Sequence, residues 1–323
     1  TQGQVTGNLV TNITAGTSGN SYGFIASRNT GADENPRSTD ITFAQNTLHN
    51  IRWEALDTHG GQRIIFAGNT ITDCDRGIAL VSSDDELGDQ TFAPLECLVT
   101  GNTIDSLDDE GGRPAGIIVS GAVEGGVTVE HATGLIADNT VRRHGGTTTD
   151  GGIYLQHTRG FAVTGNVVEE CNPYGVTLVA SNDDALVASN VFIDVWSADY
   201  FSAAVDVIAS SSCTVVGNVL LAGDKTATYL NDSGVYDFGG DAASNAVVAY
   251  ANQFDAAATG AYVAGSTPST VVSELGHTGG KIGFFGTAAS AKPTVTGSRG
   301  GNAALQSLLS ALATLGLITD SSS

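Results

Sequence analysis

Short stretches of alternating apolar and polar residues recur along the chain, separated by turn-forming residues. One phrase repeats around an asparagine, as in VTGNLV, FAGNTI and VTGNVV. Alternation with a period of two predicts half-buried strands, so the phrase indicates a strand on each side of the asparagine. The shared residue is Asn8, Asn46, Asn69, Asn102, Asn139, Asn166, Asn190, Asn218 or Asn252, at intervals of 23 to 38 residues.

A second phrase starts with a glycine and continues as a short alternating strand. It follows most of the asparagines by 8 to 16 residues, at Gly23, Gly77, Gly116, Gly152, Gly175, Gly234 and Gly260. Each period therefore contains two strand signals and two turns, which make one coil. A single coil cannot bury its apolar side alone, but stacked coils enclose a shared core. We therefore predict an all-β fold, a right-handed single-stranded parallel β-helix, over residues 1–275.

The repeated asparagine is expected to hold the coils together. Asparagine tolerates the left-handed backbone conformation of an inner turn, and its amide can hydrogen-bond the same residue in the coils above and below. An asparagine ladder is the expected result. The cysteines lie five residues before or after a ladder asparagine, and equivalent positions three or four coils apart exceed disulfide reach. We therefore expect free, largely buried thiols at Cys74, Cys97, Cys171 and Cys213.

The repeat stops after about residue 275. A linker rich in Gly, Pro, Ser and Thr is expected at 276–300, followed by a short C-terminal α-helix within a tail at 301–323. Asn302 can cap the start of this helix, and Gly316 sits near its end. The tail either covers the open end of the β-helix or joins copies of the chain. The second role rests on a short a/d seam, which consists of Leu305, Leu308, Leu312 and Leu315.

Two resemblances suggest where such a protein works. The segment KIGFFGTAASAKPTVTGSRGGNAALQSLLSALATLGLITDSS resembles a C-terminal module of phage and prophage tail proteins, in which it follows fibre or β-helix domains. The repeat region is similar to the pectate-lyase-like rods of viral tail spikes. These resemblances imply an extracellular homotrimer in a virion tail, which contacts other tail proteins and recognises a host surface polysaccharide or glycoprotein. A purely structural virion protein is an alternative.

Composition and charge limit the remaining partners. The 323 residues carry a formal net charge of −21, which repels nucleic acid and anionic lipid headgroups. No apolar run is long enough to span a bilayer, so neither nucleic-acid binding nor membrane insertion is expected. Scarce lysine and abundant aspartate favour a halophilic source, although a high-GC genome would also account for them. The chain begins inside a repeat, so we expect a segment upstream of Thr1.

The densest group of chemically active residues is Trp53-Glu54-Ala55-Leu56-Asp57-Thr58-His59, followed one coil later by Asp75 and Arg76. Asp57 and His59 alternate along one strand and so share a face. The segment is similar to the Asp-Pro-His signature of β-helical alginate epimerases and lyases, with Thr58 in place of the proline and Glu54 where a tyrosine is expected. The resemblance implies that His59 or Asp57 abstracts a proton beside a uronate carboxylate while Arg76 offsets the enolate charge.

Other interpretations of this group remain open. Glycoside hydrolysis needs two carboxyl groups at a suitable separation, and Asp57 with Asp75 on adjacent coils can meet that need. Alternatively, the segment closes a turn, with Asp57 bonded to backbone amides. The sequence therefore leaves binding without cleavage, a polysaccharide lyase or epimerase, and a glycoside hydrolase as candidates.

A second group is the main basic concentration in an acidic chain, and it predicts a glycan-binding strip together with Trp53. Its members are Arg142, Arg143, His144, Asp150, Tyr154, His157 and Arg159. Local compensation of the acidic loops is the alternative. Those loops show no ordered ligand spacing, and the chain has no zinc-type Cys/His spacing or phosphate loop, so no metal and no cofactor are expected.

Overall fold

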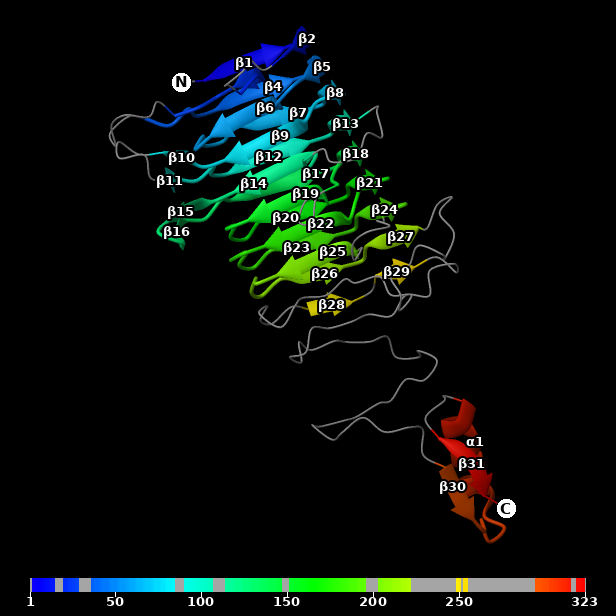
Figure 1. Cartoon of the computed structure of the whole chain (residues 1–323). Helices are drawn as coiled ribbons and strands as arrows, with labels where there is room; N and C mark the ends of the chain where they lie inside the picture. Colours follow the sequence, from blue (N-terminus) through cyan, green and yellow to red (C-terminus); the bar gives the residue numbers. More distant parts are fainter. Residues whose placement is uncertain are drawn as a thin grey trace. The chain divides into compact units, whose positions relative to one another are not determined.

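Parallel strands stack into three sheets over most of the chain (Figure 1). The computed structural model describes residues 2–14, 20–28, 36–84, 90–106, 114–146, 151–195, 203–221, 248–250, 252–254, 294–314 and 318–322. These residues divide into two units, Thr1–Val271 and Val272–Ser323. The first unit is a parallel β-helix, as the repeat predicts, because each coil contributes one strand to each sheet in turn.

The sheets are named here by their order along a coil. Within the described residues, sheet A contains β1 (Gly3–Thr6), β4 (Ile41–Ala44), β7 (Ile65–Ala67), β12 (Cys97–Thr100), β17 (Gly134–Ala137), β20 (Ala162–Thr164), β23 (Leu186–Ala188), β26 (Thr214–Val216) and β28 (Val248–Tyr250). Sheet B contains β2 (Leu9–Ile13), β5 (Thr47–Ile51), β8 (Thr70–Thr72), β13 (Thr103–Asp105), β18 (Thr140–Arg142), β21 (Val167–Glu169), β24 (Val191–Ile193), β27 (Val219–Leu221) and β29 (Gln253–Phe254).

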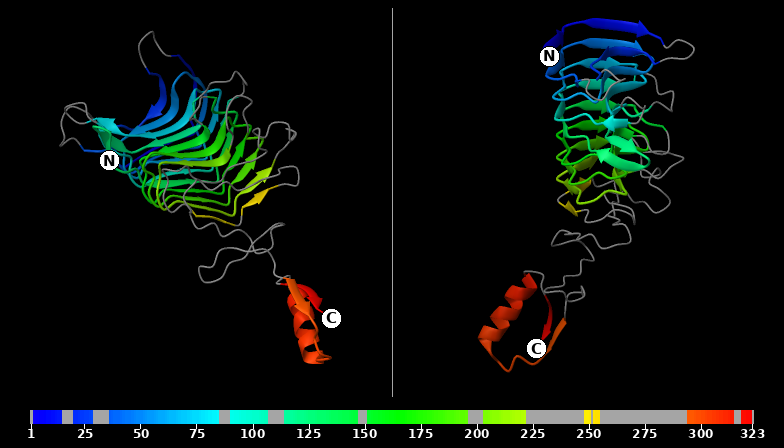
Figure 2. Two further views of the ribbon diagram at one scale, coloured as in Figure 1. Left: turned by 60° about the horizontal axis from the view of Figure 1, so that its bottom comes forward. Right: turned by 90° about the vertical axis from the view of Figure 1, so that its left-hand side faces the viewer.

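Sheet C forms the third side and carries the candidate site. Its described strands are β3 (Tyr22–Ile25), β6 (Glu54–His59), β9 (Arg76–Val81), β14 (Ile117–Ser120), β19 (Gly151–Gln156), β22 (Tyr174–Val179) and β25 (Ala203–Ile208). Two antiparallel hairpins follow sheet C strands, β10 (Ser83–Asp84) with β11 (Gln90–Phe92) and β15 (Ala122–Glu124) with β16 (Val127–Glu130). Figure 2 shows the three stacks from two further directions.

The core lies inside the coils. Each strand places apolar side chains in register with those of its neighbours, and the rows from the three sheets meet in one continuous cluster. Representative rows are Phe43, Phe66 and Val99 in sheet A, Leu48, Ile71 and Ile104 in sheet B, and Leu56, Ile78 and Ile117 in sheet C. This is the burial that a single coil cannot achieve alone.

The asparagine ladder is confirmed at every predicted position. From Asn8 to Asn252, each side-chain amide donates to Oδ1 of the asparagine in the next coil at 2.9–3.0 Å. The backbone N–H of each asparagine from Asn8 to Asn218 donates to the same oxygen. The turn between sheets A and B therefore has its polar groups paired, although most of these side chains are fully buried.

The left-handed residue in this turn is not the asparagine, and our prediction was wrong on that point. The positive φ angles belong to the residue before it, which is Gly7, Gln45, Gly68, Gly101, Asp138, Gly165, Ser189 or Gly217. Glycine is common at this position because it adopts positive φ without a steric penalty. The asparagine keeps an ordinary backbone and contributes through its amide.

The four cysteines are free and buried. Burial raises the pKa of the Cys171 thiol to about 12, and those of Cys97 and Cys213 to about 11. Since the thiolate is the reactive form, these side chains serve as small apolar core residues.

The second unit is a β–α–β element. Strands β30 (Thr294–Gly297) and β31 (Thr319–Ser322) pair in parallel and are connected through helix α1 (Ala303–Thr314). Asn302 caps the helix as expected, because its Oδ1 accepts from the backbone N–H groups of Ala304 at 3.0 Å and Leu305 at 3.1 Å. Strand β30 falls within the stretch expected as a linker, since its TVTG sequence is too short to stand out from a Ser/Thr-rich background.

Candidate functional site

The candidate site depends on a local break in β6, where side chains stop alternating between the inner and outer faces of sheet C. Ala55 and Leu56 both belong to the buried core cluster, although they are consecutive residues of β6. Glu54 pairs with Arg76, and Leu56 pairs with Ile78. Ala55 and Gly77, which lie between these pairs, are not part of the regular pairing. Two successive inward residues, as in a β-bulge, shift the outward positions by one.

The glycine phrase of the sequence marks this same position in neighbouring strands. A Cβ on Gly77 would lie 2.4 Å from Cγ2 of Ile104, and a Cβ on Gly175 would lie 2.4 Å from Cδ1 of Phe192. Both contacted residues are core residues of sheet B, so this slot faces the interior and is filled by glycine or, in β6, by alanine.

Because of this shift, the side chains of Glu54, Asp57 and His59 gather on the outer face of β6. Oδ2 of Asp57 lies 3.0 Å from Nε2 of His59. One carboxylate oxygen of Glu54, one of Asp57 and a ring nitrogen of His59 all lie within 4.8 Å of one another. Strict alternation would have placed Glu54 on the opposite face from Asp57, which is why the sequence did not predict that their carboxyl groups lie together.

These groups are buried to an unusual degree for charged residues. The side chain of Asp57 is 0% exposed and that of Glu54 is 4% exposed, while His59 retains 33%. Burial raises the pKa of both carboxyls, with the neighbouring Asp57 charge adding to the shift at Glu54. Burial alone would lower the pKa of His59, but the hydrogen bond and negative charge of Asp57 outweigh it and raise that pKa.

Cationic and aromatic side chains border the group. Arg76 Nη1 donates to Glu54 Oε1 at 2.8 Å, and its guanidinium lies 4.7 Å from the centre of the Trp53 ring. The ring of Tyr22 meets that of His59 edge to face at 6.3 Å between centroids. A cation, two aromatic rings and an imidazole thus lie together around two buried carboxyls.

Three of the four predicted catalytic residues lie at this group. Asp57 and His59 are members of it, and Arg76 contacts it through Glu54. Asp75 instead pairs with Arg52, at 3.6 Å between Nη1 and Oδ1. The carboxyl group beside Asp57 is therefore that of Glu54, which comes from the same strand and not from the next coil.

The predicted basic strip is distributed over several sites. Arg142 and Arg143 lie at the end of β18 and pair with carboxylates of neighbouring coils, Arg142 with Glu169 at 2.9 Å and Arg143 with Asp105 at 2.6 Å. His144 is buried, with Nδ1 3.1 Å from the Pro114 carbonyl oxygen. Asp150 lies outside the described residues. Arg142 and Arg143 thus lie beside acidic residues of neighbouring coils, an arrangement consistent with the alternative of local charge compensation.

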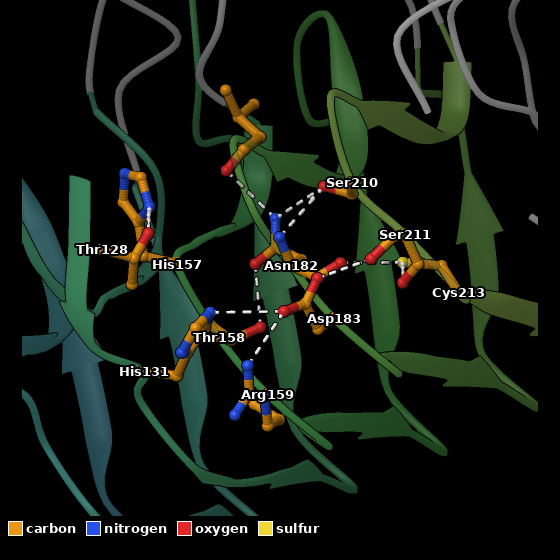
Figure 3. A network of polar contacts seen from close by, with 11 residues as sticks. Thr128, His131, His157, Thr158, Arg159, Asn182, Asp183, Ser210, Ser211 and Cys213 are labelled. Atoms are coloured by element: carbon orange, nitrogen blue, oxygen red, sulfur yellow. Dashed lines mark hydrogen bonds and ion pairs between the residues drawn. The ribbon is translucent and has the colours of Figure 1, made fainter. Parts of the chain in front are cut away.

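The rest of the strip lies at or beyond strand β19. Tyr154 is on the outer face of sheet C, in the register row that contains Asp57. His157 and Arg159 lie in the turn that follows, where His157 Nδ1 is 2.8 Å from Thr128 Oγ1 and Arg159 Nη2 is 3.3 Å from Asp183 Oδ2 (Figure 3). The arginines at 142 and 143 and those turn residues thus lie at opposite ends of β19.

Figure 3 also shows a second polar ladder that sequence reasoning missed. Thr158 Oγ1 donates to Asn182 Oδ1 at 2.8 Å, and Asn182 Nδ2 donates to Ser210 Oγ at 3.1 Å. All three are buried at the turn between sheets C and A. The residue type changes from coil to coil, so no repeated letter indicates this ladder in the sequence.

The outer face of sheet A carries a groove of about 600 Å³, which the sequence also did not indicate. Ile65 and Leu98 contribute to its lining, together with Arg63, which pairs with Asp40 at 2.6 Å and with Glu96 at 3.6 Å.

Among the described residues, no helix has the length and apolar character required to cross a membrane.

Comparison with known families agrees with the stacked-coil architecture. Residues 4–273 match the family described as the right-handed beta helix region. The chain belongs to this right-handed β-helix family. No curated protein matches the sequence of this β-helix.

Solved structures similar to this β-helix include a DFA-IIIase, a bacteriophage tailspike protein and a bacterial surface adhesin. DFA-IIIase from Arthrobacter chlorophenolicus A6, in complex with GF2, is 16% identical with a TM-score of 0.44, covering 69% of this chain and 52% of that one. Tailspike protein 3 of bacteriophage CBA120 is 16% identical with a TM-score of 0.41, covering 91% and 53%. The surface protein and adhesin PfbA of Streptococcus pneumoniae is 11% identical with a TM-score of 0.43, covering 71% and 67%. The chain thus spans about half the length of the first two.

Proposed function

We propose that this β-helix is a tail spike or fibre of a virus and that it recognises a host surface polysaccharide through the outer face of sheet C. The observation that carries the proposal is the group around His59. Buried carboxyls such as those of Glu54 and Asp57 reduce stability unless they are fully paired. Their concentration beside partly exposed aromatic and cationic groups is typical of a functional site.

The chemistry of this face suits a carbohydrate. The rings of Trp53 and Tyr22 offer apolar surfaces with polar edges, while Arg76 and His59 offer hydrogen-bond donors. Stacked coils extend the face along the solenoid, and Tyr154 lies further along the row that contains Asp57. An extended ligand such as a polysaccharide matches a repeated surface of this kind better than a small molecule does.

The assignment to a virion rests on the C-terminal segment. Its sequence resembles a module of phage tail proteins, and its helix leaves Leu305 and Leu308 on the surface. A homotrimer joined through such leucines would place several sheet C faces on one extracellular particle. Several weak glycan contacts would then act together, because linked sites bind with higher overall affinity.

Binding to purified polysaccharides tests this proposal. The full chain would be titrated against a panel of prokaryotic capsule and surface-layer polysaccharides by calorimetry, and the best ligand would be repeated with Trp53→Ala. We expect at least a tenfold loss of affinity for this variant, since stacking on an aromatic ring is lost. Arg63→Ala, in the groove of sheet A, is the matched control and should bind normally. Equal binding by both variants, or no binding to any glycan, would refute the proposal.

A second candidate is an enzyme that cleaves or modifies the polysaccharide. The 3.0 Å contact between Asp57 and His59 favours it, because a buried carboxylate that orients an imidazole is a common arrangement for proton transfer. Products would be followed as new reducing ends for a hydrolase, as unsaturated uronates for a lyase, and by NMR for an epimerase. Bound glycan that stays chemically unchanged would eliminate this candidate and leave the binding function intact.

A further inference from the structure

The group on β6 contains two carboxylate oxygens that the protein does not pair. Within the described part of the chain, Glu54 Oε2 and Asp57 Oδ1 are buried and have no hydrogen-bond partner. We propose that Glu54, Asp57 and His59 bind one divalent metal ion, and that Zn²⁺ and Mn²⁺ suit these ligands best.

The charges at the site leave room for a cation. Arg76 contacts Glu54 through Oε1 and so offsets one of the two carboxylates. The other carboxylate, that of Asp57, is fully buried, and its Oδ2 lies 3.0 Å from the imidazole of His59. A buried carboxylate without a full complement of partners is strongly unfavourable, and an ion bound between the two carboxyls would remove that penalty.

The geometry fits ligands that share one ion. Zinc binds imidazole nitrogen and carboxylate oxygen at about 2.0–2.2 Å, so two adjacent ligands of one ion lie roughly 3 Å apart. Nε2 of His59 and Oδ2 of Asp57 are 3.0 Å apart, and one oxygen from each carboxylate and a ring nitrogen of His59 all lie within 4.8 Å of one another. Small rotations of the Glu54 side chain would complete the set, because the backbone of β6 already holds the three residues on one face.

The donor types favour particular ions. Ca²⁺ and Mg²⁺ prefer all-oxygen sites, whereas one imidazole with two carboxylates suits Zn²⁺ or Mn²⁺. Two further contacts would orient the ligands from outside: the Arg76 guanidinium on Glu54 and a hydrogen bond between His59 and the backbone of Ser82. Three protein ligands leave a coordination position open, and the partial exposure of His59 gives it access to solvent.

This inference does not depend on the proposed polysaccharide function, and its test uses metal binding alone. The untagged full chain would be stripped with EDTA, dialysed and titrated with Zn²⁺ in the presence of excess Mg²⁺, which occupies the acidic surface. We expect one tightly bound Zn²⁺ per chain and a raised melting temperature. Co²⁺ in place of zinc should give visible absorption bands of an ion with a nitrogen ligand.

Variants separate this site from general binding by an acidic protein. Asp57→Asn and His59→Gln should each weaken Zn²⁺ binding by at least tenfold, while Asp75→Asn, in the neighbouring Arg52 pair, should bind like the parent. Circular dichroism would check that each variant folds. If Asp57→Asn does not fold, the Zn²⁺ affinity of His59→Gln tests the proposal, since His59 is partly exposed. The absence of stoichiometric Zn²⁺, or equal binding by His59→Gln, would overturn the proposal. A bound ion also occupies the lone pair of His59 Nε2, so it would exclude proton abstraction by that atom.

Discussion

Single polar side chains are stable inside this protein when each finds its partner in the next coil. The asparagine ladder does this at the turn between sheets A and B, and Thr158, Asn182 and Ser210 do it at the turn between sheets C and A. Glu54 Oε2 and Asp57 Oδ1 are exceptions, because β6 places them on the outer face, where they are buried without a hydrogen-bond partner. The two ladders therefore have a structural role, whereas these two oxygens belong to the candidate site.

Removing one amide from the middle of the ladder should be costly. In Asn102→Ala, the amides of Asn69 and Asn139 lose a partner, and so does the carbonyl oxygen of Phe66. Unpaired buried groups of this kind reduce the free energy of unfolding by about 1–3 kcal/mol each, so we expect a loss of about 3 kcal/mol in urea unfolding. Asn20→Ala, which removes one exposed hydrogen bond to Tyr22, is the control and should change little. Equal effects would contradict a structural role for the ladder.

The charged residue beside the second ladder predicts a dependence on acid. Hydrogen bonding from Ser211, followed by the contacts with Arg159, lowers the pKa of Asp183 in the folded protein. A lowered folded pKa means that the unfolded state binds more protons, so this stabilisation is present above about pH 3.9 and is lost as the pH falls through the folded value. Melting temperatures between pH 6 and pH 2 should therefore fall less steeply for Asp183→Asn than for the parent. Parallel curves would show that Asp183 contributes nothing.

At the scale of single elements, the strands of sheet C combine a predictable pattern with an unpredictable one. The glycine phrase marks the start of β3, β9, β14, β19 and β22, while its predictions at Gly234 and Gly260 lie outside the described residues. Alternation correctly places Asp57 and His59 on one face. The alternation pattern cannot reveal that Ala55 and Leu56 both turn inward. That shift depends on how closely the side chains of sheet B approach the strand. The same limit explains why Asp75 was expected beside Asp57, whereas Glu54 occupies that position.

The inward slot should accept a methyl group poorly where a rigid ring faces it. In Gly175→Ala, the new Cβ would lie 2.4 Å from Phe192 Cδ1 and 2.6 Å from the Ala204 carbonyl oxygen, so the strands must shift. Overpacking of this kind typically costs about 1–3 kcal/mol, which thermal unfolding would detect. Gly3→Ala is the control, because its Cβ would meet nothing closer than 4.0 Å. If Gly175→Ala is as stable as that control, close packing does not explain the glycine.

At the scale of the whole molecule, the stacking of the described coils followed from the sequence because one residue type recurs in register. The second unit was harder to predict. Its helix and cap were expected from the leucine spacing and Asn302, but the parallel pairing of β30 with β31 joins two short polar segments without a strand pattern. Contacts between copies of the chain are likewise not encoded in any repeat, and they stay a prediction.

The assembly prediction concerns the exposed leucines of α1. Leu305 is 39% exposed and Leu308 is 55% exposed, while Leu309 is buried within the unit. We expect light scattering to give three times the chain mass of 32.8 kDa, and Leu305→Asp with Leu308→Asp to give single chains, because charge at the seam opposes association. Ser307→Asp, on an exposed position of the same helix, should remain associated. A parent protein that is already a single chain would contradict the prediction.

The turn between sheets A and B also bears on how such a rod can change in length. Successive ladder asparagines are separated by 23 to 38 residues, yet their amides meet at 2.9–3.0 Å throughout. Extra residues are therefore accommodated outside this turn. Each ladder asparagine meets the asparagine of the next coil whatever the length of its own coil. Duplication or deletion of the gene segment for one complete coil would preserve the contact between neighbouring asparagines. The number of coils can thus change by one at a time, independently of the surface loops.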